Sequence, residues 1–259
     1  MSKGTALVTG ASAGLGTGFA RALAAGGHDL ILTARRLDRL DALAAELREK
    51  HDIRVETIAG DLADPAAPAA LVAEVATRGL AVNTLINNAG FGLSGAFATQ
   101  DRAQLLAMVQ VNCQALVELS HALLPGMLQM RSGSILNVAS TAAFQAGPGM
   151  AIYYASKAFV LSFSEALHEE VRSQGVHVTA LCPGPTATEF FDAAGTSESF
   201  ALRRLAGDAD KVVQAGLAAL AANRAVKIPG AANAFGAFST RLTPRWLLRR
   251  VVAGIQSGR

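Results

Sequence analysis

The stretch Thr9-Gly-Ala-Ser-Ala-Gly-Leu-Gly16 follows an apolar run at residues 4–9 and opens a helical pattern at residues 15–26. Glycines at this junction let backbone N–H groups and a helix N-terminus come close to a pyrophosphate. Their spacing is Gly-x-x-x-Gly-x-Gly, which differs from the commoner Gly-x-Gly-x-x-Gly fingerprint. A plain tight turn would also explain such a loop in isolation. Its position between the first strand and the first helix favours phosphate binding.

Short apolar runs and longer helical patterns alternate along the rest of the chain. Further strands are expected at residues 28–34, 54–59, 84–87, 134–138, 176–181 and 226–228. Further helices are expected at residues 37–47, 66–78, 101–129 and 151–173, and Pro125 is expected to end or kink the helix of residues 101–129. This alternation indicates βαβ units. The expected fold class is α/β: a single-domain Rossmann-type doubly wound parallel sheet with helices on both faces, and ligands bound beyond the carboxyl ends of its strands.

Composition narrows the class of protein. The 259 residues are 51% hydrophobic with a net charge of +3, which favours one domain over residues 1–259 and gives no sign of nucleic-acid binding. The sequence has no uninterrupted apolar stretch of roughly 18 residues, so no membrane-spanning helix is expected. The N-terminus runs directly into the first strand, so no signal peptide is expected. Cys113 and Cys182 are expected to be buried free thiols in a reducing compartment, which favours a cytoplasmic protein. The five histidines lack metal-ligand spacing, so no metal is expected.

The end of the second strand indicates which dinucleotide the loop would hold. A carboxylate at this place would bind the 2′-hydroxyl of the adenosine ribose. The sequence instead has Thr33-Ala34-Arg35-Arg36, and an arginine can form paired hydrogen bonds with a 2′-phosphate. The expected cofactor is therefore NADP(H) in preference to NAD(H). The alternative is two solvated arginines at a helix start.

Two more strand ends carry polar or small residues. Asp61 and Leu62 end the third strand, where Asp61 can accept a hydrogen bond from the adenine amino group or cap the next helix. Asn88, Ala89 and Gly90 end the fourth strand, and the last two are small enough to let the backbone pass close to the adenosine ribose. Alone, this second group would read as an ordinary turn.

Tyr153 and Lys157 lie four residues apart in a predicted helix, and Ser140 lies thirteen residues before the tyrosine. Positions i and i+4 share a helix face, so the lysine ammonium is expected near the phenol. A nearby positive charge would lower the phenol pKa and prepare Tyr153 to give or take a proton at a carbonyl or alcohol. Ser140 can hydrogen-bond the same substrate oxygen. A chance pair on a helix face is the plain alternative.

Taken together, these ordered motifs resemble the classical short-chain dehydrogenases/reductases over about residues 4–190. The resemblance also assigns Asn112 as the helix asparagine, and Pro183-Gly-x-x-x-Thr188 as the segment that holds the nicotinamide carboxamide. It implies the catalytic residues Asn112, Ser140, Tyr153 and Lys157. The expected cofactor-binding residues are Gly10, Ser12, Ala13, Gly14, Leu15, Gly16, Arg35, Arg36, Asp61, Leu62, Asn88, Ala89, Gly90, Tyr153, Lys157, Pro183, Gly184, Thr186 and Thr188.

The resemblance implies an NADP(H)-dependent oxidoreductase of the NADP-preferring bacterial branch, which reduces a ketone, an aldehyde or a 3-oxoacyl compound. In that reaction Tyr153 is the proton donor, Ser140 polarises the substrate oxygen, Lys157 lowers the Tyr153 pKa, and Asn112 holds a water. Asn112 could instead be a buried polar residue that bonds a neighbouring helix carbonyl. Alternative functions are an NAD-linked alcohol dehydrogenase and an NADP-binding regulator without turnover. The four intact catalytic residues argue against the regulator.

The substrate and the partners are less defined by the motifs. A variable segment at about residues 185–215 is expected to form a lid, and the residues around the site suggest a fairly apolar substrate: Phe91, Leu93, Phe144, Met150, Phe190, Phe191 and Phe200. The same residues could equally be ordinary core or lid packing. The basic amphipathic segment at about residues 235–259 could pack on its own domain, contact a partner subunit or lie on a membrane surface, the last being the least favoured. In relatives such as these the long helices pair across a dimer axis, so a homodimer or homotetramer is expected.

Overall fold

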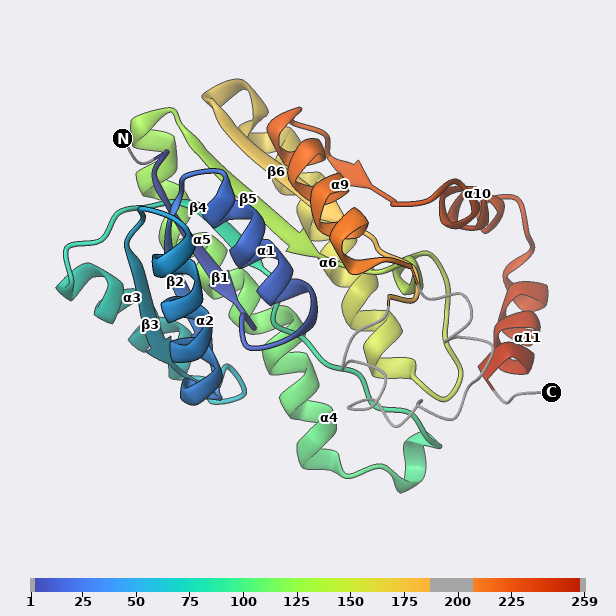
Figure 1. Ribbon diagram of the computed structural model, residues 1–259. Coiled ribbons are helices and arrows are strands. Elements are labelled where there is room, and N and C mark those ends of the chain that lie inside the picture. Colours follow the sequence, from blue (N-terminus) through green and yellow to red (C-terminus); the bar gives the residue numbers. More distant parts are fainter. Residues whose placement is uncertain (1–2, 187–206, 257–259) are drawn as a thin grey trace.

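The computed structural model describes residues 3–186 and 207–256, and over this part of the chain seven parallel strands form one sheet (Figure 1). The strands are β1 (Thr5–Thr9), β2 (Asp29–Ala34), β3 (Val55–Ala59), β4 (Val82–Asn87), β5 (Gly133–Val138), β6 (Val176–Leu181) and β7 (Val226–Lys227). Their order across the sheet is β3-β2-β1-β4-β5-β6-β7. The expected fold class is confirmed, and each predicted strand is present within two residues of its expected bounds.

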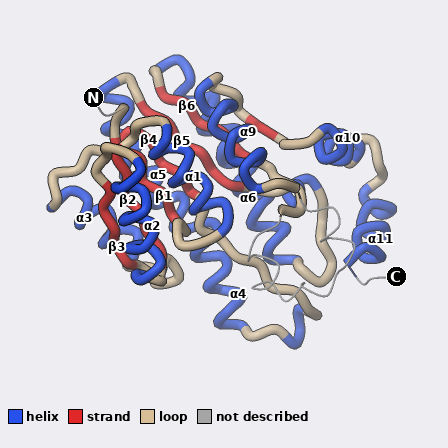
Figure 2. Tube along the Cα trace, viewed as in Figure 1, coloured by secondary structure: helices blue, strands red, loops and turns tan. Residues whose placement is uncertain are grey.

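Helices alternate with the strands along the chain (Figure 2). They are α1 (Gly14–Ala25), α2 (Leu37–Lys50), α3 (Ala67–Thr77), α4 (Arg102–Val109), α5 (Ala115–Met130), α6 (Ala151–Val171), α9 (Ala209–Ala221), α10 (Ala231–Ser239) and α11 (Arg245–Gln256). Short 3₁₀ turns lie at η1 (Phe97–Thr99), η3 (Thr141–Phe144) and η4 (Arg172–Gln174). Parallel strands require such crossover helices, because the chain must return to the same edge of the sheet before the next strand begins.

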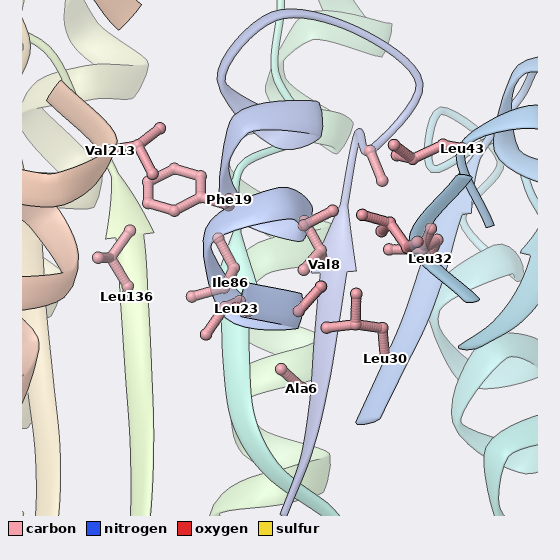
Figure 3. Packing of buried hydrophobic residues seen from close by; sticks show 14 of the residues in the cluster. Ala6, Val8, Phe19, Leu23, Leu30, Leu32, Leu43, Ile86, Leu136 and Val213 are labelled. Carbon is pink, nitrogen blue, oxygen red and sulfur yellow. The ribbon is translucent and has the colours of Figure 1, made fainter. Parts of the chain in front are cut away.

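Two hydrophobic cores sandwich the sheet. On one face α1, α2 and α9 pack on the strands, and Figure 3 shows the ring of Phe19 from α1 directed toward Val213 of α9. On the other face α3, α5 and α6 pack through residues such as Leu119 and Leu167. The strands are therefore buried on both sides, which explains their nearly continuous apolar sequences.

The strand order reverses between β1 and β4, which are neighbours although two strands separate them in sequence. After β1 the chain turns to α1 on one face, and after β4 it runs toward α4 on the other. A crevice outside the carboxyl ends of the strands results at this point, where ligands bind in sheets of this type. The glycine loop after β1 and residues 88–90 after β4 border it.

The predicted helix at residues 101–129 is interrupted. A π-helical turn, η2 (Gln110–Gln114), separates α4 from α5, and Asn112 lies within it. Such turns insert one extra residue into a helix and are frequent at functional sites. The side chain of Asn112 is bonded outside its helix, a tertiary contact that hydrophobic periodicity does not reveal. α5 also continues past Pro125 to Met130, so the proline does not end the helix.

A buried polar network joins the carboxyl ends of β4 and β5. Asn87 and Asn137 are paired in register on β4 and β5, and Asn87 Nδ2 donates to Asn137 Oδ1 at 2.9 Å. Asn87 Nδ2 also donates to Ser120 Oγ at 3.0 Å, and Asn137 Nδ2 donates to Ser164 Oγ at 2.9 Å. Because each amide has partners, the network fixes the register of β4 against β5 and ties both strands to α5 and α6.

The C-terminal helices extend from the β7 edge of the sheet (Figure 1). Ala237 and Val252 are buried, but most large apolar side chains there are exposed: Phe235, Phe238, Leu242, Trp246, Leu247 and Val251. Packing on its own domain therefore accounts for only part of this segment. In the part of the chain that the structure describes, no helix combines the length and apolar composition needed to cross a bilayer. Both cysteines are buried and free, as expected.

Candidate active site

The glycine loop is shaped by close backbone contacts. Gly10 and Gly14 have φ angles of 66° and 55°, in the left-handed region that glycine adopts without strain. A Cβ on Gly16 would lie 2.2 Å from the carbonyl oxygen of Gly10. The N-cap of α1 is Ala13, which offers no side-chain acceptor, and the first turn of the helix contains no acidic residue. The loop and helix start therefore form a surface suited to an anion.

Thr9 and Asn88 fasten this loop to the end of β4. The Thr9 hydroxyl accepts hydrogen bonds from the N–H groups of Asn88 and Ala89 at 3.0 and 2.9 Å. Asn88 Nδ2 in turn donates to the carbonyl oxygen of Thr9 at 2.9 Å. Thr9 is a positioning residue that was not among the predicted site residues, although it directly precedes the glycine loop.

A cavity of about 410 Å³ lies against the carboxyl ends of β1 to β4. Its walls include eight of the predicted cofactor residues, namely Gly10, Ser12, Arg35, Arg36, Asp61, Leu62, Ala89 and Gly90. The remaining walls include Gln104, Ala107 and Val111, from α4 and the π-helical turn, and Phe91. The helix residues were not among the predicted site residues, since nothing in their local pattern distinguishes them from other helix-surface positions.

The two arginines occupy different environments in this cavity. Arg35 is exposed, whereas Arg36 is half-buried, with its Nη2 atom 3.3 Å from Ser12 Oγ in the glycine loop. Asp61 Oδ1 accepts a hydrogen bond from the N–H of Ala63 at 3.1 Å, so it stabilises a local turn. It does not cap α3, which begins only at Ala67.

Ser140, Tyr153 and Lys157 come together next to this cavity. Tyr153 and Lys157 are buried in the first half of α6, and Lys157 Nζ lies 5.8 Å from the centre of the Tyr153 ring. Lys157 Nζ also donates to the carbonyl oxygen of Val138 at 2.8 Å, at the end of β5. Ser140 lies two residues later, and its hydroxyl is hydrogen-bonded to the Tyr153 side chain. The structure thus brings the three side chains together.

The expected direction of the Tyr153 pKa shift is wrong for this structure. Burial raises the pKa of Tyr153 to about 12, while the hydrogen bond with Ser140 lowers it to a smaller extent. Lys157 does not offset this, because its ammonium is directed to Val138 and burial lowers its own pKa to about 8. Desolvation disfavours both charged forms, and the i, i+4 spacing alone carries no information on burial.

Asn112 connects two parts of the site. Its Oδ1 atom accepts from the N–H of Phe91 at 3.1 Å, and its Nδ2 atom donates to the carbonyl oxygen of Phe91 at 3.0 Å. Nδ2 also donates to Ser156 Oγ at 3.0 Å, and that hydroxyl donates to the carbonyl oxygen of Tyr153 at 2.7 Å. The side chain thus joins the segment after β4 to α6. The expected role in holding a water stays a prediction.

The segment after β6 approaches Ser140. The carbonyl oxygen of Pro183 accepts from the N–H of Thr141 at 2.9 Å and from Ser140 Oγ at 3.5 Å. Thr186 Oγ1 donates to the carbonyl oxygen of Gly184 at 3.0 Å. Thr188 and most of the expected lid, together with Phe190, Phe191 and Phe200, lie outside the described residues.

An apolar cluster surrounds the Tyr153 side chain. Its buried members are Leu105, Met108, Ala142, Met150 and Tyr153, and its half-buried members are Phe91, Leu93, Ile152 and Tyr154. The N–H of Gly95 donates to the carbonyl oxygen of Gly149 at 2.9 Å, which joins the two loops that carry Leu93 and Met150. Phe144 belongs to a neighbouring cluster with Leu116 and Val160.

Comparison with known proteins places this arrangement among enzymes. A sequence model described as short chain dehydrogenase matches residues 4–199. The chain is 42% identical to a sulfoacetaldehyde reductase of Chromohalobacter salexigens, over 71% of this chain and 72% of that protein. It is 34% identical to a human very-long-chain 3-oxoacyl-CoA reductase, over 71% of this chain and 60% of that protein.

Two solved structures resemble this chain over nearly its whole length. A short-chain dehydrogenase from Sphingobium yanoikuyae in complex with NADPH is 36% identical with a TM-score of 0.83, covering 92% of this chain and 93% of that one. A bulky-bulky ketone specific alcohol dehydrogenase from Comamonas testosteroni is 32% identical with a TM-score of 0.79, covering 93% of each chain.

Proposed function

This chain belongs to the short-chain dehydrogenase family and is an oxidoreductase, and on that basis we propose that it is an NADP(H)-dependent carbonyl reductase. The observation that carries the proposal is the meeting of Ser140, Tyr153 and Lys157 beside a cavity that contains Arg35 and Arg36. A proton donor, an oxygen-polarising hydroxyl and a phosphate-binding pair thus lie along one edge of the sheet. A regulator without turnover would not require this proton-transfer arrangement.

The residues present fit a dinucleotide phosphate. A Cβ on Gly90 would lie 3.0 Å from Asn112 Oδ1 and 3.4 Å from Lys157 Nζ, so a side chain at this position would crowd both groups. Gly10 to Gly16 would hold the pyrophosphate, and Arg35 with Arg36 and Ser12 would hold a 2′-phosphate. The cofactor, when bound, would supply the hydride that adds to a carbonyl carbon.

Each active-site side chain then has a defined role. With a pKa of about 12, Tyr153 keeps its proton at neutral pH, which is the form that can protonate the oxygen of a carbonyl being reduced. Ser140 hydrogen-bonds and polarises the same oxygen. Lys157 joins the start of α6 to the end of β5, because its Nζ atom donates to the carbonyl oxygen of Val138 beside the Tyr153 ring. Asn112 acts as a positioning residue, since its amide holds Phe91 and Ser156.

The apolar cluster around Tyr153 indicates the kind of substrate. Leu93, Met150 and Tyr154 would contact the groups on either side of the carbonyl, and apolar groups are favoured there because they displace water from apolar side chains. We therefore expect an apolar ketone, aldehyde or 3-oxoacyl compound. The name of the Chromohalobacter relative indicates an anionic aldehyde instead, so this choice needs a direct test.

The test combines binding and turnover. Isothermal titration should give a lower dissociation constant for NADPH than for NADH. NADPH consumption should then be screened over aliphatic and aromatic ketones, aldehydes, 3-oxoacyl thioesters and sulfoacetaldehyde. Turnover of apolar carbonyls is the expected result, and turnover of sulfoacetaldehyde alone would refute the substrate class. NADPH binding without turnover of any of them would support a regulator.

We further propose that the protein is a homo-oligomer. Leu106 of α4, Phe159 of α6 and Trp246 of α11 are exposed by 54%, 44% and 55%, and burial against another copy would remove these apolar side chains from water. Light scattering after size-exclusion chromatography should give the mass of a dimer or a tetramer, and a monomer mass would refute this.

A further inference from the structure

Asn233, in the first turn of α10, lies directly against the backbone of Gly184. A Cβ on Gly184 would lie 2.5 Å from Asn233 Oδ1 and 2.6 Å from Asn233 Nδ2. Real Cβ atoms are not found at such distances, so the amide of Asn233 occupies the space that a side chain at position 184 would need. Gly184 is not among the glycines with a positive φ. A side chain at position 184 would therefore require either the Asn233 amide or the backbone to move.

The Asn233 amide is itself held in place. Its Nδ2 atom donates to the carbonyl oxygen of Pro229 at 2.9 Å. Pro229 is buried, and the next residue, Gly230, has a φ angle of 85° that turns the chain into α10. Rotation of the amide away from Gly184 would break this hydrogen bond. The turn after β7 therefore determines where the Asn233 side chain lies.

Gly184 belongs to the segment that touches Ser140. The carbonyl oxygen of the preceding residue, Pro183, accepts from the N–H of Thr141 and from Ser140 Oγ. α10 also contacts η3, the turn that follows Ser140. The C-terminal part of the chain thus supports the site from outside the family match at residues 4–199.

We propose that Asn233 is a positioning residue that fixes the backbone of residues 183–186 against Ser140, and so shapes the reactive half of the cofactor site. The inference rests on the proposed function, in which the 2′-phosphate lies at Arg35 and Arg36 and the reacting end of the cofactor lies at Tyr153 and Ser140. Gly184 lies near Ser140, where the reacting end of the cofactor is proposed to lie. It is not among the walls of the cavity that contains Arg35 and Arg36. Asn233 should therefore influence binding of one half of the dinucleotide only.

The experiment is a double-mutant cycle on Asn233→Ala and Gly184→Ala. Gly236→Ala is the matched control, because it lies in the same helix and a Cβ there meets nothing within 4 Å. Dissociation constants are measured by isothermal titration for NADPH and for adenosine 2′,5′-bisphosphate, which carries only the adenosine half. Thermal melting of each variant reports on the fold.

Gly184→Ala alone should weaken NADPH binding by about tenfold or more, since either the backbone or the amide must move. Asn233→Ala alone should weaken it by about threefold or more, and adding Gly184→Ala to Asn233→Ala should cost less than about threefold, because the space is then vacant. Binding of adenosine 2′,5′-bisphosphate should change by less than about twofold in every variant, as should NADPH binding to Gly236→Ala.

Additive effects in the double variant would overturn the inference, and so would an Asn233→Ala protein that binds NADPH as tightly as the control. Equal weakening of both ligands together with a lower melting temperature would also overturn it, because that pattern indicates general damage to the fold. If the wild-type protein bound neither ligand, the proposed function would fail and the cofactor role of Asn233 with it. Wild-type binding with an unaffected Asn233→Ala variant would refute this inference alone.

Discussion

The ammonium of Lys157 lies 5.8 Å from the ring centre of Tyr153, one helical turn earlier in α6, and both side chains are buried. Burial raises the pKa of the phenol to about 12 and lowers that of the amine to about 8. The phenol is therefore protonated at neutral pH. This arrangement suits the donation of a proton to a carbonyl oxygen.

Removal of the phenol hydroxyl should slow turnover strongly without loss of cofactor binding. Tyr153→Phe should lower kcat by about a hundredfold to ten-thousandfold, which is the range for loss of a general acid. Tyr154→Phe is the control, because it keeps the ring that would contact the substrate, and the Tyr154 hydroxyl has no assigned role in proton transfer. Steady-state kinetics on a confirmed substrate measures both. Near-normal turnover of Tyr153→Phe would disprove the proton-donor role.

The charge on Arg35 and Arg36 should set the preference for NADP(H). Substitution of either arginine by alanine should raise the KM for NADPH by about tenfold, as charge-assisted hydrogen bonds of this kind contribute roughly 1.5–3 kcal/mol each. The KM for NADH should change little. Arg21→Ala serves as the control, because Arg21 pairs with Glu46 and is not part of the cavity wall. Parallel losses for both cofactors would contradict the assignment.

Burial of Lys157 should make stability depend on pH. The unfolded chain holds the lysine proton up to its ordinary pKa of 10.5, whereas the folded chain releases it at about 8. Below about pH 8 the folded protein therefore carries the full free-energy cost of burying the Lys157 ammonium, and this cost falls as the pH rises. Relative to Lys157→Met, the wild-type protein should gain about 2 kcal/mol between about pH 7 and pH 10.

Urea unfolding of both proteins across this range measures the difference. The measurements should stop near pH 10.0, which is the ordinary pKa of a tyrosine such as Tyr153. The pKa of Tyr153 is raised in the folded protein, so its contribution to stability is lost as the pH rises further. Unfolding free energies that run parallel in the two proteins would show that the Lys157 pKa is not lowered by folding.

The asparagine pair in the sheet should be important for stability. Asn137→Ala removes the acceptor of Asn87 Nδ2 and the donor to Ser164 Oγ, and the cost of unpaired buried polar groups is about 1–3 kcal/mol. The free energy of unfolding should fall by about this amount. Gln174→Ala, which removes one exposed bond to Glu170, should stay within about 0.5 kcal/mol of the wild type. Equal losses of unfolding free energy in the two variants would show that the network does not stabilise the fold.

Two glycines should respond to alanine in opposite ways. At Gly16 a Cβ would meet the Gly10 carbonyl oxygen at 2.2 Å, so Gly16→Ala should distort the loop and weaken binding of both NADPH and adenosine 2′,5′-bisphosphate. Gly126, inside α5, has nothing within 4 Å of a Cβ. Gly126→Ala should therefore raise stability by up to about 1 kcal/mol, because alanine favours the helix. Calorimetry tests both, and a Gly16→Ala protein with normal affinity would contradict the close packing of the loop.

Much of the site could be predicted from local sequence. The glycines, the arginines after β2 and the Tyr153–Lys157 pair each combine a residue type with a spacing, and such features act within a few residues of one another. Gln104, Ala107 and Ser156 could not be found in this way. Their importance comes from contact with residues far along the chain, as when Ser156 joins Asn112 to α6.

The amino-acid sequence by itself determined the order of strands and helices, since hydrophobic periodicity is a local property of the chain. It also determined which chemical groups lie at the strand ends. Only the tertiary structure decided how deeply Tyr153 and Lys157 are buried, and hence the direction in which their pKa values move. It likewise brought Asn233 onto Gly184 and opened a π-helical turn at Asn112, because contacts and desolvation depend on segments that meet only after the chain has folded.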